Sequence, residues 1–112
     1  MPQELRKIVF NNEELMSAAY DYCLRTDVRI PQVPIDEIVI GEADNAVLTL
    51  KFATVDASDQ KEFALSRDQV GAALIKYCSA NNIPMARMAK KILKVDKGEI
   101  SLMVSIQWPT KP

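Results

Sequence analysis

Two segments of the sequence resemble each other closely, AAYDYC at residues 18–23 and ALIKYC at residues 73–78. Each lies in a stretch where apolar residues recur every three or four positions, which is the spacing of an amphipathic helix. We therefore expect two helices with similar apolar faces. A shift of 55 positions aligns these faces, in the pairs Leu15 and Val70, Ala18 and Ala73, Ala19 and Leu74, Tyr22 and Tyr77, and Cys23 and Cys78.

Each expected helix begins after a residue whose side chain can accept hydrogen bonds from the first free backbone amides. Asn11 or Asn12 can take this role in the first helix. In the second helix, Ser66 is followed three residues later by Gln69, which fits the capping-box pattern. The helices are expected to end near Thr26-Asp27 and near Asn81-Asn82.

The match between the two halves continues beyond the helices. An Ile-Pro pair follows each helix, as Ile30-Pro31 and Ile83-Pro84, and two strand-like runs come next. A shorter strand-like run precedes each helix. Both halves therefore have the pattern strand, helix, strand, strand, and together they fit one domain. That domain is residues 1–112, with tandem repeats at 6–54 and 61–107.

These patterns predict an α+β fold with an antiparallel sheet and the two main helices on one of its faces. If the halves are equivalent, strand 100–107 pairs with strand 6–10, as strand 46–53 pairs with strand 61–65. A ferredoxin-like arrangement, with the order βαββαβ, is the alternative. The runs at 36–40 and 91–95 complete two three-strand meanders, which a pseudo-twofold axis would relate.

The composition limits the chemistry that the chain can support. The sequence has no His, which is the commonest general base and metal ligand. This excludes a Ser-His-Asp triad and His-containing zinc sites, and two Cys cannot complete a four-Cys site in a monomer. With three Gly, the chain cannot form a Gly-rich phosphate loop. We therefore predict no catalytic residue, cofactor or metal. An enzyme that uses Lys or carboxylate chemistry is an alternative to this prediction.

The sequence also bears on the cellular compartment. The first ten residues, MPQELRKIVF, are charged and lack the apolar core of a secretory signal. No run approaches the roughly 20 apolar residues that a membrane-spanning helix needs. We therefore expect a cytoplasmic protein with reduced thiols and no membrane partner.

The most basic stretch is ARMAKKILKVDKG, residues 86–98. If residues 84–92 form a short helix, its cations share one face by i, i+3, i+4, i+7 spacing. That face either contacts the phosphates of a nucleic acid or another anion, or is an ordinary solvated surface. A helix-turn-helix over residues 67–92 is a narrower form of the first alternative. The candidate anion contacts are Arg87, Lys90, Lys91, Lys94 and Lys97.

Other chemically distinctive residues have simpler interpretations. Cys23 and Cys78 lie on the apolar helix faces, so core packing is favoured over a redox or nucleophilic role. Trp108 either closes one end of the core or marks a partner surface. The acidic residues around the first hairpin fit a solvated rim, because the loop pattern of a calcium site is absent. These acidic residues are Asp36, Glu37, Glu42 and Asp44.

These exclusions favour a non-enzymatic protein-interaction or assembly module, which acts as a homodimer or as a subunit of a larger complex. The positive support is that small sheets leave edge strands, and edge strands pair readily with another chain. Strands 6–10 and 100–107 are the candidates for such pairing. The alternative is a nucleic-acid-binding regulator that uses the basic residues of segment 84–97.

Overall fold

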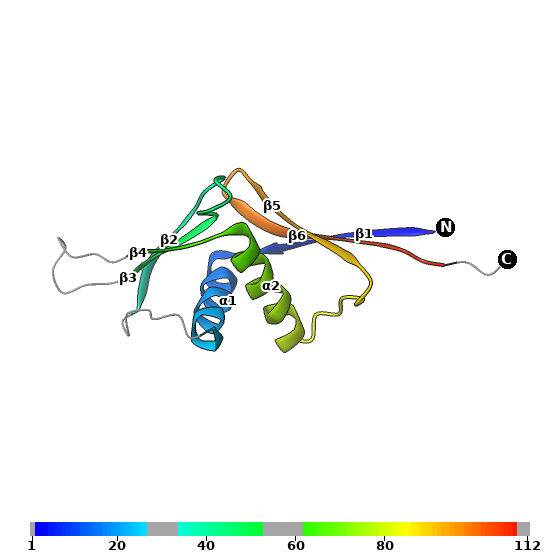
Figure 1. Cartoon of the computed structure of the whole chain (residues 1–112), viewed down its shortest axis with the longest axis horizontal. Helices are drawn as coiled ribbons and strands as arrows, with labels where there is room; N and C mark the ends of the chain where they lie inside the picture. The colour runs from blue at the N-terminus through cyan, green and yellow to red at the C-terminus, as the bar shows by residue number, and fades with distance from the viewer. Residues whose placement is uncertain (1, 27–33, 53–61, 110–112) are drawn as a thin grey trace.

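The computed structural model describes residues 2–26, 34–52 and 62–109, which form two helices and six strands (Figure 1). The predicted α+β class is confirmed. In chain order the helices and strands are β1 (Gln3–Phe10), α1 (Asn12–Arg25), β2 (Ile35–Ile40), β3 (Leu48–Phe52), β4 (Glu62–Leu65), α2 (Arg67–Ala80), β5 (Lys90–Asp96) and β6 (Glu99–Gln107).

The strands form two antiparallel three-stranded sheets, with the orders β1-β6-β5 and β2-β3-β4. The predicted pairing of the first strand with the last, and of β3 with β4, is confirmed. Lys97 and Gly98 form the tight turn between β5 and β6, and both have positive φ, as a type I′ hairpin turn requires. A ferredoxin-like fold places four strands in one sheet, so this alternative is wrong.

Each sheet combines strands from both of the proposed repeats. β1 belongs to residues 6–54 and pairs with the β5–β6 hairpin, whereas β4 belongs to residues 61–107 and pairs with the β2–β3 hairpin. The tandem duplication itself stays a prediction, and Ile30-Pro31 lies outside the described residues. What the structure corrects is the number of sheets, since the strands divide into two sheets.

Both helices begin with a complete capping box. In α1, the Glu14 amide donates to Asn11 Oδ1 at 2.8 Å, and the Asn11 amide donates to Glu14 Oε1 at 2.9 Å. Asn11 is therefore the cap. In α2, the Gln69 amide donates to Ser66 Oγ at 3.3 Å, and the Ser66 amide donates to Gln69 Oε1 at 2.8 Å. The predicted helix ends are also confirmed, with Thr26 and Asn81 as the C-terminal caps.

The two helices lie next to each other on the same side of the two sheets, which meet above them as an arch (Figure 1). Four of the five predicted positions on each helix face are fully buried, and the exceptions are the two Tyr residues. Tyr22 and Tyr77 are half-buried and pack against the border of the core. The Tyr77 ring meets the Phe10 ring edge-on, with centroids 6.2 Å apart.

The capping box of α2 allows a direct test of how this helix is stabilised. Replacing Ser66 by Ala removes the side-chain acceptor and is expected to lower the free energy of unfolding by about 1 kcal/mol, whereas Gly costs only a few tenths. Urea denaturation measures both values. Ser79→Ala, at an exposed position near the helix end, is the matched control and should cause no loss. Equal losses for Ser66→Ala and Ser79→Ala would contradict a capping role.

Candidate functional site

The basic segment does not form the predicted helix. Residues 84–89 are an irregular connection with a turn, in which the Ala89 amide donates to the Ala86 carbonyl at 3.0 Å, and β5 begins at Lys90. The helix over 84–92 and the helix-turn-helix over 67–92 are therefore wrong. Ile92 and Val95 are β-branched and favour a strand, and pairing with β6 supplies the backbone hydrogen bonds that a short helix would have made.

The candidate cations on β5 lie on both faces of the sheet, because successive side chains of a strand point to opposite faces. Lys91 is on the face that the helices cover, in line with buried Leu93, whereas Lys90 and Lys94 are exposed on the opposite face. Lys97 lies in the hairpin turn, and Arg87 lies in the connection before β5. The predicted single cationic face therefore does not exist.

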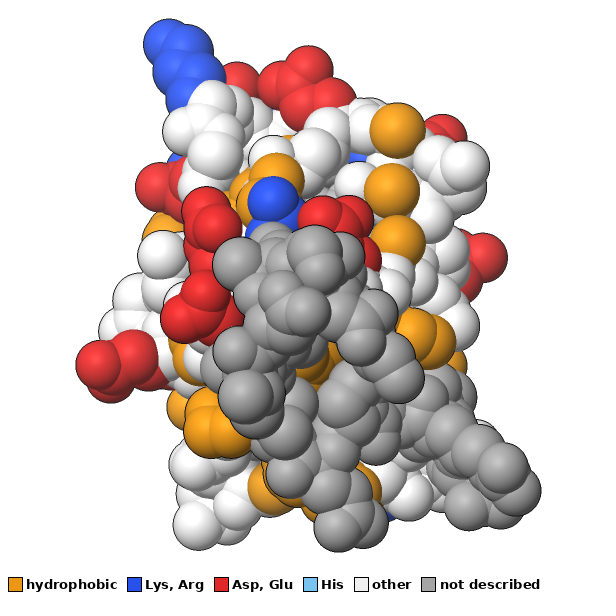
Figure 2. Space-filling view, turned by 90° about the vertical axis from the view of Figure 1, so that its left-hand side faces the viewer, with side chains coloured by type: hydrophobic (Ala, Val, Ile, Leu, Met, Phe, Trp, Pro, Cys, Tyr) orange, Lys and Arg blue, Asp and Glu red, His pale blue; other side chains and the backbone are white. Residues whose placement is uncertain are grey.

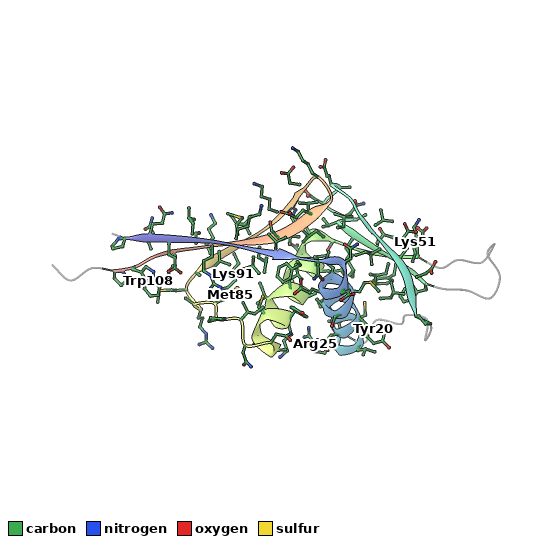
Figure 3. All side chains as sticks on the ribbon, turned by 180° about the vertical axis from the view of Figure 1, so that it is seen from behind. Tyr20, Arg25, Lys51, Met85, Lys91 and Trp108 are labelled. Atoms are coloured by element: carbon green, nitrogen blue, oxygen red, sulfur yellow. The ribbon has the colours of Figure 1, made fainter. Side chains whose placement is uncertain are left out.

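A surface groove brings two of these cations together. It has a volume of about 530 Å³ and lies between the C-terminal half of α2 and the connection that leads to β5. Lys91 Nζ donates to the carbonyl oxygens of Ala89 and Ala86, at 3.1 and 3.4 Å. The groove is lined by Ile75, Ser79, Asn82, Ile83, Pro84, Met85, Arg87 and Lys91, of which Met85 and Lys91 are labelled in Figure 3.

The open face is the side of the β1-β6-β5 sheet that points away from the helices, and no helix of the described ranges covers it (Figure 1). Large apolar side chains are exposed there, with Leu5 at 65%, Val9 at 48% and Ile92 at 50%. Sequence reasoning missed these three residues. The alternation of residues in RKIVF and KILKV places these apolar side chains on one face of each strand. It does not show which face of the sheet the helices leave uncovered.

β1 is also an edge strand, with β6 as its one neighbour in the sheet. The Trp108 amide donates to the Pro2 carbonyl at 2.8 Å, so even-numbered residues of β1 direct their backbone groups toward β6. The odd-numbered residues direct theirs to the free edge. β6 lies in the middle of its sheet, so the predicted use of strand 100–107 as an edge is wrong. The free backbone groups belong to Gln3, Leu5, Lys7 and Val9.

Trp108 does not close the core. Its side chain is 43% exposed, and its backbone continues the pairing with β1 just beyond the end of β6. Figure 3 shows it far from the helices, because β1 and β6 extend past them toward the two ends of the chain. Its role as a partner surface stays a prediction.

The two thiols are buried in the core. Cys23 and Cys78 are both free and fully buried. Burial raises the pKa of each thiol, and for Cys78 the positive charge of Arg6 partly offsets this increase, while Glu14 adds to it. Neither environment supports a reactive thiolate.

The acidic residues of the first hairpin are exposed, as a solvated rim requires, and acidic side chains are prominent on that end of the molecule (Figure 2). Asp44 forms an ion pair with Arg67, with Nε and Oδ1 3.0 Å apart. Among the described residues, no group of three or more Asp, Glu or Cys side chains could hold a metal ion. No helix in the described part of the chain is long and apolar enough to cross a membrane.

Comparisons of the chain with protein families, characterised proteins and solved structures found no match. Any functional interpretation therefore depends on the groove, the open face and the free edge of β1.

The buried thiols give a prediction about reactivity. At pH 8 the native protein is expected to react with a disulfide reagent such as DTNB at least 100-fold more slowly than a free thiol, because burial blocks access and disfavours the thiolate. Unfolding in urea should expose two rapidly reacting thiols per chain. Fast reaction of either thiol in the native state would contradict the packing role.

Proposed function

We propose that this protein is a non-enzymatic assembly module that forms a homodimer through the free edge of β1. The main support is the length of this edge strand, which has eight residues and exposes Leu5 and Val9. Long edge strands with exposed apolar residues readily pair with another chain. Antiparallel pairing of two copies would join their β1-β6-β5 sheets into one six-stranded sheet.

The other edge strands have features that discourage pairing. β5 carries three Lys residues, β4 has only four residues, and β2 has an irregular register between Ile35 and Glu37. Lysines, short strands and bulges are the usual protections of sheet edges. Of the four edges in the described sheets, β1 is therefore the best suited to a partner.

The sequence of β1 favours one register of self-pairing. When Leu5 faces Leu5 of the second copy, Glu4 faces Arg6 of that copy and Arg6 faces its Glu4. Two neighbouring registers keep the same faces of the two sheets on the same side. One of them places Arg6 opposite Arg6 of the second copy, and the other places Glu4 opposite Glu4. Like charges directly opposite destabilise a sheet, whereas opposite charges contribute about 0.2–1 kcal/mol per pair. The Leu5-centred register is therefore the one that we propose.

Arg6 remains available for this role. One of its guanidinium nitrogens donates to the Pro84 carbonyl at 2.6 Å. A guanidinium has five N–H donors, so the others can reach a carboxylate on a second chain.

Charge reversal tests both the dimer and its register. Glu4→Arg and Arg6→Glu are each expected to raise the dimer dissociation constant about tenfold, because each places like charges opposite each other twice. A mixture of the two variants should form heterodimers with restored affinity, since every facing pair is again attractive. Sedimentation equilibrium at low ionic strength measures all three affinities.

Lys94→Glu, on the edge strand across the sheet, is the matched control and should leave the affinity within twofold of the original. Circular dichroism and urea denaturation check that each variant is folded. The proposal is contradicted if the wild-type protein stays monomeric at millimolar concentration. It is also contradicted if neither Glu4→Arg nor Arg6→Glu changes the dimer dissociation constant.

A nucleic-acid-binding role is the second candidate, and a charge asymmetry favours it. The β1-β6-β5 sheet, its β5–β6 turn and the connection before β5 together contain seven cationic residues and three carboxylates, although the whole chain has a net charge of −1. Lys90 and Lys94 lie on the open face, where they could contact phosphates. Gel-shift titrations with duplex and single-stranded DNA and RNA at two salt concentrations test this role, and no binding at low salt would reject it.

A further inference from the structure

The groove beside α2 combines apolar walls with positive charge. Ile75 is 38% exposed although it is a large apolar residue on a helix, and it lines the groove together with Ile83 and Met85. Arg87 and Lys91 add two cations to the lining, and Ser79 and Asn82 add neutral polar groups. Such a lining suits a ligand that has an apolar part and an anionic part.

Within the part of the chain that the structure describes, no carboxylate pairs with the positive charges of the groove. None of the ion pairs formed within the described residues involves Arg87 or Lys91. The contacts of Lys91 Nζ with the carbonyls of Ala86 and Ala89 hold the ammonium group in place but leave its charge uncompensated. An ammonium group has three N–H donors, so one remains for a ligand.

The volume of about 530 Å³ lies within the roughly 300–1,000 Å³ typical of small-molecule sites. We propose that this groove binds a small amphipathic carboxylate, whose apolar chain lies against Ile75, Ile83 and Met85 while its carboxylate meets Arg87 and Lys91. The planar guanidinium fork matches the two oxygens of a carboxylate. No residue of β1 lines this groove, although Arg6 of β1 donates to the carbonyl of its lining residue Pro84. Arg87 and Lys91 lie outside β1, so variants of these two residues test the groove separately from the proposed dimer.

Octanoate is a suitable probe because it combines both features at a size that the groove can hold. Binding is followed by isothermal titration calorimetry and by amide chemical shifts in nuclear magnetic resonance spectra. We expect shifts at Ile75, Ile83 and Met85. Acetate lacks the apolar chain and 1-octanol lacks the charge, so each should bind at least tenfold more weakly than octanoate.

Two variants test the assignment of the cations. Arg87→Gln and Lys91→Met should each weaken octanoate binding at least tenfold. Arg87 is exposed, so its replacement should leave the fold intact even if Lys91→Met does not. Lys90→Gln and Lys94→Met are matched controls, because they lie on the opposite face of β5 and should change the affinity less than twofold.

The proposal is overturned if octanoate gives no shifts at the groove residues, or if 1-octanol binds as tightly as octanoate. It is also overturned if the control variants weaken binding as much as Arg87→Gln does. Tenfold weakening confined to the Arg87 and Lys91 variants supports it.

Discussion

The core of this protein is built around the packing of α1 against α2 beneath the two sheets. The buried helix faces consist largely of small side chains, including Ala18, Ala19 and Ala73, which let the helices approach closely. The strands on both sides then bury their larger apolar residues against this pair. Apolar burial on this scale is the main favourable term in folding, so the helix pair determines which face of each sheet is inside.

Arg67 connects the two sheets at the point where α2 begins. Its guanidinium pairs with Asp44 in the β2–β3 hairpin and donates to the Leu93 carbonyl of β5, while its amide donates to the Asp44 carbonyl at 2.8 Å. One residue therefore contacts both sheets. This contact holds β5 beside the start of α2, and the later part of α2 forms one wall of the groove with the connection that follows it.

The division into two sheets also explains where the accessible surfaces lie. Two helices cover one side of the arch, and the other side of the β1-β6-β5 sheet keeps Leu5, Val9 and Ile92 exposed. β1 and β6 continue past the helices, which leaves Trp108 outside the core. The edge, the open face and the groove all result from an arrangement in which two helices cannot cover every surface of six strands.

The features that depend on neighbours along the chain were predictable from the sequence. These are the two helices with their N-terminal caps, the buried positions such as Leu15 and Val70, and the strand-like runs. The pairing of the first strand with the last also followed, because the repeated pattern suggested it. The sequence could not settle segment 84–92, since both its cations and its apolar residues fit a helical spacing, while KILKV at 91–95 also fits a strand.

The conformation of that segment depends on strand pairing, because the backbone groups of β5 form hydrogen bonds with β6. The same pairing places Lys91 on the face that the helices cover, where it lines the groove. It places Lys90 and Lys94 on the open face, so the predicted cations do not share one surface. Which surfaces remain free depends on how helices and sheets cover one another, and the spacing of residues along the chain does not specify this.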